Sequence, residues 1–365
     1  MSSKTERVRH FFAGGNTGEG FYSFYDQIMG PDARRLYLLK GGPGTGKSTF
    51  MREVAQVMLA HGFELEFFHC SSDPNSLDGV AIPALKAGLI DGTAPHIMDP
   101  VHPGVVDQII NLGAYWDETP LTAAKEKILE TAAKKKSCFE RAYVYLAAAK
   151  GVYQHWEATN RTRLAGESWL PVYFRLKEEI FAQHQPSGKP GTLRHLFASA
   201  ITPEGPVNFL ESICAGAGKI YALDGPPGSG QSFILERLVA TTLEYGLAAE
   251  VYHCALDPRR IEHLYLPKLK IAVVSSHWPH QFCPEQNGER IETAGFVNQY
   301  SPLSQETVKE ARLVYLDLLE RSMNWLRKAK TLHTELEKYY TACMDWQQIT
   351  ALKEDVISDL LRISQ

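Results

Sequence analysis

Hydrophobic residues in this chain form short apolar runs that alternate with amphipathic segments. The run at 36–39 precedes a glycine-rich stretch, and helical spacing follows from residue 49 to residue 60. Short strands rich in β-branched or aromatic residues that alternate with helices are typical of an α/β fold. We therefore predict a mostly parallel sheet with helices on both faces.

Helical apolar spacing dominates two later parts of the chain. Residues 121–159 are rich in Ala, Lys, Glu and Leu and contain no proline, and a further helix is expected at 169–181. Residues 303–341 and 346–363 repeat this arrangement. Each pair predicts a helical hairpin after an α/β core. The hairpins could be lids, dimerisation arms, binding surfaces for a protein partner, or plain packing.

The chain contains an internal duplication. The sequence RHFFA at 9–13 returns as RHLFA at 194–198, and EFFHC at 66–70 returns as EVYHC at 250–254. Between them, GGPGTGKS at 41–48 returns as GPPGSGQS at 225–232. A repeat of this length indicates two copies of one fold. The loop-like segment 185–191 marks the boundary, so we predict domains at 1–188 and 189–365.

Residues 41–48, here called the first loop, have the pattern of a phosphate-binding P-loop between a strand and a helix. Glycines let backbone N–H groups approach a polyanion, and the helix N-terminus adds unpaired N–H groups. Lys47 is expected to reach the β- and γ-phosphates, and the Ser48 hydroxyl to bind Mg²⁺. Thr49 is expected near the α-phosphate. The predicted nucleotide-binding residues are Gly42, Pro43, Gly44, Thr45, Gly46, Lys47, Ser48 and Thr49.

A Mg²⁺ site needs an acidic residue at the end of a neighbouring strand. Asp91 follows the apolar run 87–90, and we assign it as the Walker B aspartate that holds Mg²⁺ through water, together with Ser48. Asp73, Asp78 and Asp99 are the alternatives.

The second loop, residues 225–232, lacks two of these groups. Gln231 stands where the first copy has Lys47, and Ser275 stands where it has Asp91. Loss of both is expected if lysine and aspartate serve one metal–nucleotide function, because electrostatic stabilisation dominates phosphoryl transfer. We predict that the second site does not turn over. It could bind nucleotide weakly or serve only as structure.

The other candidate residues lie beyond the strand at 66–70. Asp73 could act as a general base or order the attacking water, although Asp257 in the second copy favours a structural role. His96 could sense the γ-phosphate. The run 134–136 of three lysines is interpreted as a solvated helix face. No arginine is selected for the developing charge from the set Arg9, Arg52, Arg141, Arg161 and Arg163.

The composition argues against several classes of function. The net charge is −4 and the pI is near 6.4, so there is no global basic field for nucleic acid or an anionic membrane. We find no secretory signal and no apolar run of ~20 residues that would span a bilayer. The six cysteines form no CxxC pair and are interpreted as reduced thiols. We expect a cytoplasmic protein.

The combined motifs resemble a bacterial family of tandem P-loop proteins described as ATPases or as nucleotide-kinase-like. The resemblance covers nearly the whole chain and implies a P-loop NTPase fold and ATP binding, while the family's substrate is not settled. The residues that carry it lie at 12–17, 41–49, 69–80, 91–96, 99–100, 103–104 and 111–113.

These observations lead to three hypotheses about function. The first is an ATPase in which Mg²⁺ and ATP bind to the first half, with Lys47, Asp91 and Asp73 as the catalytic residues. The second is a kinase that transfers the γ-phosphate to a small-molecule acceptor near Asp73 and His96. The third is a nucleotide-regulated scaffold without turnover. The intact lysine, serine and aspartate favour turnover.

Overall fold

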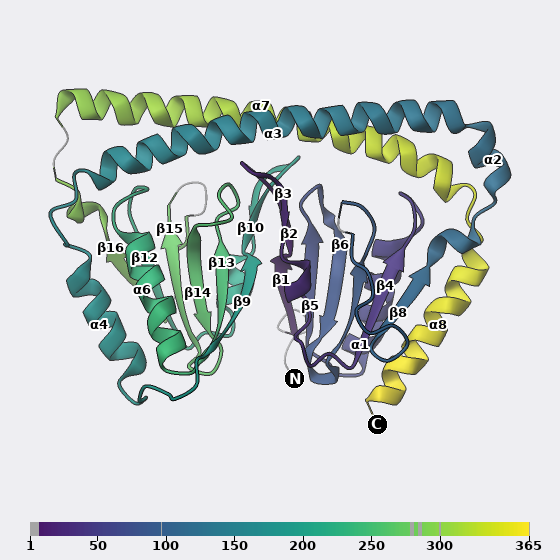
Figure 1. The fold of residues 1–365 in the computed structure, drawn as a ribbon, viewed down its shortest axis with the longest axis horizontal. Helices are drawn as coiled ribbons and strands as arrows, with labels where there is room; N and C mark the ends of the chain where they lie inside the picture. The colour runs from purple at the N-terminus through teal and green to yellow at the C-terminus, as the bar shows by residue number, and fades with distance from the viewer. Residues whose placement is uncertain (1–6, 96, 278–280, 284–286, 299–300, 365) are drawn as a thin grey trace.

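The computed structural model describes residues 7–95, 97–277, 281–283, 287–298 and 301–364. The strands before residue 188 and the strands after it, here called the first and second halves, lie side by side beneath two long helices (Figure 1). The first half contains β1 (Val8–Phe12), β2 (Gly14–Thr17), β3 (Gly20–Ser23), β4 (Arg35–Lys40), α1 (Lys47–Ala60), β5 (Leu65–Cys70), β6 (Asp73–Ile82), β7 (Ala87–Asp91), β8 (Asp107–Asn111), α2 (Glu118–Ala123), α3 (Lys125–Arg161) and α4 (Leu170–Phe181). The second contains β9 (Thr192–Phe197), β10 (Ser199–Thr202), β11 (Gly205–Asn208), α5 (Leu210–Cys214), β12 (Lys219–Asp224), α6 (Gln231–Glu244), β13 (Ala248–His253), β14 (Ile261–Leu266), β15 (Ile271–Ser276), β16 (Gly288–Glu292), α7 (Pro302–Thr341) and α8 (Trp346–Ile363).

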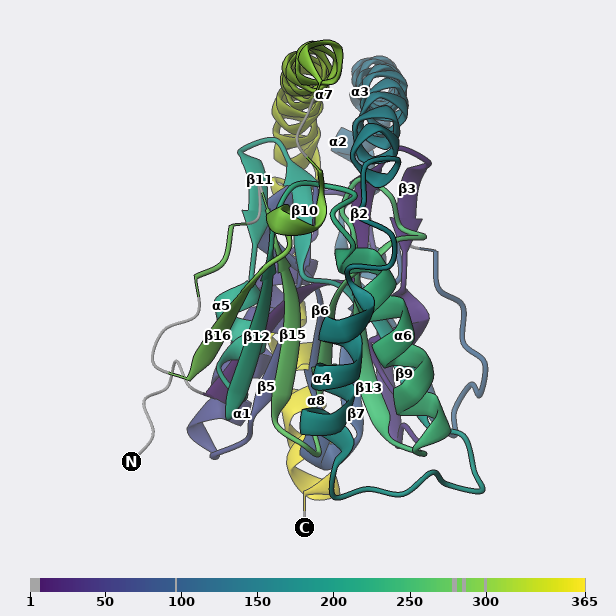
Figure 2. The ribbon, with the colours of Figure 1, turned by 90° about the vertical axis from the view of Figure 1, so that its left-hand side faces the viewer.

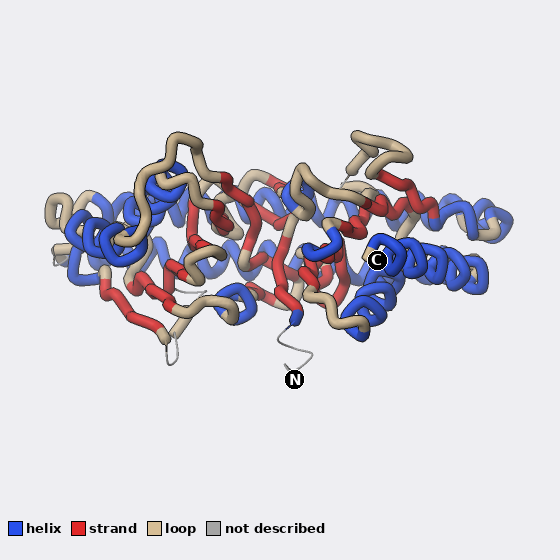
Figure 3. Tube along the Cα trace, turned by 90° about the horizontal axis from the view of Figure 1, so that it is seen from below, coloured by secondary structure: helices blue, strands red, loops and turns tan. Residues whose placement is uncertain are grey.

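Among the described residues, twelve strands form one continuous sheet. From the middle outwards, the first half has the order β1-β5-β6-β7-β4-β8, and the second has the matching order β9-β13-β14-β15-β12-β16. The halves join where Phe12 pairs antiparallel with Phe197. Seen from below, the strands follow one another along the molecule (Figure 3). The predicted α/β class is confirmed, but the sheet is mixed, because β6 and β14 run antiparallel to both of their neighbours.

The strand that leads into the first loop is buried on both faces. Tyr37 and Leu39 of β4 pack in a cluster with α1 and α8, whereas Leu36 and Leu38 belong to the cluster on the opposite face. Such two-sided burial explains why β4 reads as an unbroken apolar run. Short elements, including α5, cover the second face. β4 is thus packed on both faces up to the point where it ends at the first loop.

The predicted helical segments are present, but they do not form hairpins. α3 packs along α7, and the pair crosses over both halves (Figures 1 and 2). α3 has 37 residues, which is about 55 Å of helix and long enough to reach from one half to the other. The expected hairpin is therefore wrong, because each long helix buries its apolar side against its counterpart. Within the described residues, no helix is long and apolar enough to cross a membrane.

Each of the shorter helices α4 and α8 packs against the half of the chain to which it does not belong in sequence, and we call this the exchange of helices. Leu360 of α8, near the C-terminus, is buried in the core of the first half, together with α1. Leu176 of α4, which precedes the boundary loop, is buried in the core of the second half, together with α6. The division at residue 188 stays a prediction about the duplicated sequence, since hydrophobic packing crosses it twice.

A charged cluster connects the halves near the middle of the sheet. Arg9 Nη1 donates to Glu250 Oε1 at 2.9 Å, and Arg194 Nη2 donates to Glu66 Oε2 at 2.8 Å. Both glutamates are buried. Each arginine thus neutralises a carboxylate of the other half, which holds the two halves in one relative position.

Candidate functional site

The first loop connects β4 to α1, as the sequence predicts. Gly44 and Gly46 have φ values of 72° and 83°, in the left-handed region that favours glycine. A Cβ atom on Gly44 would lie 2.6 Å from the backbone oxygen of Glu337, so this position also has no room for a side chain. The loop therefore brings the unpaired N–H groups at the start of α1 to the end of β4.

Lys47 and Asp91 meet at this loop. Lys47 Nζ donates to the carbonyl oxygens of Gly41 and Gly42, at 2.9 Å each, and lies 3.7 Å from Asp91 Oδ2. Asp91 is brought there because β7 runs parallel to β4 with Asp91 opposite Leu39. The strand ends share one edge of the sheet, where ligands of open α/β sheets bind.

A second carboxylate lies close to Lys47. Burial raises the pKa of Asp91, although the charge of Lys47 opposes this. Burial also raises the pKa of Asp78, to about 6, against a 2.6 Å hydrogen bond from the Tyr25 hydroxyl. The charge of Asp78 raises the pKa of Asp91, the charge of Asp73 raises the pKa of Asp78, and Lys47 lowers the pKa of both Asp78 and Asp91. Of the three alternatives to Asp91, Asp78 is the one that belongs to this charged group.

The remaining loop residues differ in their surroundings. Thr45 is buried and donates to the Gly42 carbonyl at 2.9 Å, while Thr49 is exposed. Ser48 Oγ accepts the Leu77 N–H at 2.9 Å. Hydroxyl and carboxylate oxygens are the donors that Mg²⁺ prefers, and in nucleotide sites the phosphates supply most of the other ligands. Ser48 and Asp91 fit that donor set. Nowhere in the described chain, the first loop included, are three His, Cys, Asp or Glu side chains grouped to hold a metal.

Asp73 is held by an ion pair with a long helix. Its Oδ1 accepts from Lys330 Nζ of α7 at 2.8 Å, and its Oδ2 from Ser76 Oγ at 2.7 Å. Burial raises the pKa of Asp73, but these hydrogen bonds outweigh it and the net pKa is lowered. Asp99 is exposed and lies 3.5 Å from Lys40. His96 lies outside the described residues.

The same ion pair occurs in the second half. Lys150 of α3 lies 3.0 Å from Asp257 and 2.8 Å from Glu19, just as Lys330 binds Asp73 and Glu204. The second half lacks the lysine and aspartate of the first loop, yet it keeps this contact. The repetition favours a structural role for Asp73 in attaching the long helices. Its catalytic role stays a prediction.

The candidate arginines have other partners. Arg9 belongs to the central charged cluster, Arg52 donates to the Asn75 carbonyl, Arg141 lies over the Trp325 ring, Arg161 pairs with Glu157, and Arg163 donates to the Asn298 carbonyl.

Sequence reasoning missed the helices that cover the first loop. Thr341 of α7 donates to the Gly44 carbonyl at 3.0 Å, and Tyr340 and Trp346 lie against Gly42 and Gly46. These residues belong to the second copy in the sequence. The exchange of helices therefore makes the C-terminal part of the chain the cover of the N-terminal site, which no local pattern could indicate.

The second loop has the same shape with different chemistry. Gln231 Nε2 donates to the carbonyls of Gly225 at 3.0 Å and Leu223 at 3.2 Å. The neutral amide thus replaces the lysine against the loop. Ser275 is buried opposite Leu223, in the register that Asp91 has opposite Leu39.

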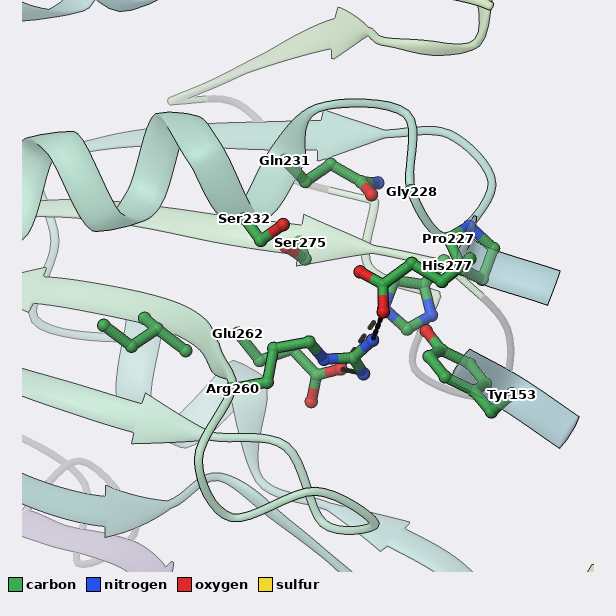
Figure 4. Close-up of a pocket in the computed structure, with 11 residues that line it drawn as sticks. Tyr153, Pro227, Gly228, Gln231, Ser232, Arg260, Glu262, Ser275 and His277 are labelled. Atoms are coloured by element: carbon green, nitrogen blue, oxygen red, sulfur yellow. Dashed lines mark hydrogen bonds and ion pairs between the residues drawn. The ribbon is translucent and has the colours of Figure 1, made fainter. Parts of the chain in front are cut away.

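A different cation occupies the pocket beside the second loop. Figure 4 shows Arg260 among the side chains that line this pocket. It pairs with Glu262 at 3.1 Å and Glu157 at 3.8 Å, and lies 4.5 Å from the centre of the Tyr153 ring. Two carboxylates already compensate this charge, so little positive potential is left for a triphosphate.

No protein-family model, curated protein or solved structure matches the chain. The family resemblance stated from the motifs therefore stays a prediction.

Proposed function

We propose that this chain consists of two tandem P-loop NTPase domains and hydrolyses ATP, with Mg²⁺, at the first loop only. The observation that carries the proposal is the 3.7 Å approach of Lys47 to Asp91 at the start of α1. The equivalent positions of the second half hold Gln231 and Ser275. A phosphate chain needs the ammonium group and the carboxylate-held metal together.

Different groups of the first half bind different parts of the nucleotide and its metal. The N–H groups of the first loop and of the first turn of α1 bind the phosphates. Lys47 leaves the two loop carbonyls and neutralises the β- and γ-phosphates. Ser48 and Asp91 hold Mg²⁺, which neutralises charge on the terminal phosphates when bound. The partly buried setting of Lys47 and Asp91 strengthens these interactions.

Hydrolysis is favoured over transfer to an acceptor because it needs only water as the nucleophile. Both hypotheses give Asp73 a catalytic role, but this carboxylate is engaged by Lys330 and Ser76, so neither can depend on it. The scaffold hypothesis leaves the retained lysine and aspartate without a purpose. ATP hydrolysis is therefore the function that the arrangement supports best.

Phosphate release from ATP by the purified chain tests this proposal. Lys47→Ala should abolish release, because it removes the only ammonium group at the first loop's carbonyls in the described structure. Gln231→Ala is the matched control at the equivalent position and should change the rate little. Equal loss in both variants would contradict the asymmetry. Phosphate that is released only as label moves to a metabolite would favour the kinase.

A further inference from the structure

Lys135 is set apart from its neighbours in the lysine run. Lys134 and Lys136 are exposed, as predicted for a solvated face, whereas Lys135 is partly buried between the long helices. Its Nζ lies 3.2 Å from His333 Nδ1 of α7. In the described part of the chain, no carboxylate lies within ion-pairing distance of Lys135. The interpretation as a solvated face is wrong for this residue.

The Lys135–His333 pair lies over the first loop. His333 Nε2 is 3.6 Å from Glu337 Oε1, and the backbone of Glu337 packs on Gly44. Burial, then the charge of Lys135 and that of Lys47, lowers the pKa of His333 to about 4. Burial also lowers the pKa of Lys135; the charge of Glu337 opposes this effect and that of Lys47 adds to it. Two ammonium groups and an imidazole thus share one partly buried region with the Glu337 carboxylate, and an added anion would stabilise the two lysines.

The duplication supplies an internal comparison. Lys150 and Lys330 make equivalent ion pairs, and the backbones of Glu157 and Glu337 pack on equivalent glycines, Gly228 and Gly44. Both matches between α3 and α7 have an offset of 180 residues.

The same offset identifies the residues that replace the pair over the second loop. Tyr315 takes the place of Lys135, and Tyr153 takes the place of His333, with ring centroids 5.3 Å apart. The polar pair is therefore present only over the loop that has Lys47 and Asp91. Simple packing between α3 and α7 is achieved by two tyrosines, so packing does not explain the lysine and the histidine.

We propose that Lys135 and His333 bind the γ-phosphate of the nucleotide held by the first loop. This inference rests on the proposed function and adds a set of residues from the long helices to the site. Because one residue comes from α3 and the other from α7, the γ-phosphate would join the two helices above the first loop.

Calorimetric titration of the intact chain with ATP and with ADP, each with Mg²⁺, tests the proposal. Lys135→Met should weaken ATP binding about tenfold or more, the usual effect of losing a charge-assisted hydrogen bond. ADP binding should change by less than about twofold, because ADP has no γ-phosphate. Lys134→Met removes the same charge from the exposed neighbour and should leave both affinities unchanged. Lys135→Arg should retain most of the ATP affinity.

A double variant, Lys135→Tyr with His333→Tyr, installs the pair that the second half already uses. It should keep the fold and lose the preference for ATP over ADP. If it fails to fold, the single Lys135→Met and Lys135→Arg variants decide the outcome.

The possible failures are distinguishable. If the unmodified chain binds no ATP, the proposed function fails. If it binds ATP, and Lys47→Ala does not, while Lys135→Met binds ATP as tightly as the unmodified chain, then only the γ-phosphate inference is overturned. Equal weakening of ATP and ADP binding by Lys135→Met would also overturn it, because the lysine would then act elsewhere.

Discussion

At the start of α1, the ammonium group of Lys47 lies with the buried carboxylate of Asp78 and the partly buried carboxylate of Asp91. The pKa values of both carboxyl groups are raised, so keeping these groups ionised lowers the stability of the fold. A group of this kind is retained where it serves a ligand, because apolar or neutral residues would be more stable there. Of these three residues, Lys47 and Asp91 are the ones assigned to the nucleotide and its metal.

Asp78→Asn should stabilise the chain most at neutral and higher pH. The pKa of Asp78 is raised from 3.8 to about 6, so its penalty to stability is absent below about pH 4, grows as the pH rises from about 4 to about 6, and is fully present above that. At pH 7.5 the buried carboxylate lowers the free energy of unfolding by about 3 kcal/mol, and at pH 5 this penalty is about 1 kcal/mol smaller. Asparagine removes this cost and can still accept the Tyr25 hydrogen bond.

Denaturant unfolding at pH 5 and pH 7.5 measures this difference. Asp99→Asn, which changes an exposed carboxylate, is the control and should have little effect at either pH. A gain for Asp78→Asn that is larger at pH 5 would contradict the argument.

Single residues of the site were predictable to different extents. Lys47 and Asp91 follow from a strand–loop–helix pattern and from an apolar run that ends in aspartate, both of which are local. The position of Asp78 depends on β6 being antiparallel, which the sequence did not indicate. Lys135 and His333 are 198 residues apart, and their contact arises only from the pairing of α3 with α7.

At the scale of elements, the exchange of α4 and α8 makes each half depend on the other. The sequence located these helices closely, and α8 has the predicted bounds, Trp346–Ile363. Apolar periodicity shows which side of a helix is buried but not what it is buried against. The hairpin prediction failed for this reason, since the same buried side serves a hairpin partner or a distant core equally well.

Leu360→Ala and Leu176→Ala form a matched pair that tests the exchange. Both side chains are fully buried, so each substitution should cost about 2–5 kcal/mol. In hydrogen exchange, Leu360→Ala should reduce protection first in α1 of the first half, and Leu176→Ala first in α6 of the second. The opposite pattern would mean that each helix stabilises its own sequence repeat.

At the scale of the whole molecule, the two unequal sites belong to one structure. They share one sheet, one charged cluster and one pair of long helices. The α/β class and the duplication were visible in the sequence because both halves repeat their motifs in register. The fusion of the halves at Phe12 and Phe197 was not, because neither residue differs from an ordinary core phenylalanine. α7 contacts the first loop through Glu337, and α3 contacts the second loop through Glu157.

The stoichiometry of nucleotide binding tests the central claim most directly. Titration of the intact chain with a non-hydrolysable ATP analogue and Mg²⁺ should give one nucleotide per chain, and Gln231→Ala should give the same. Lys47→Ala should give none, because the charge of Arg260 beside the second loop is already compensated by Glu157 and Glu262. Two nucleotides per chain, or one that survives Lys47→Ala and disappears in Gln231→Ala, would contradict the account.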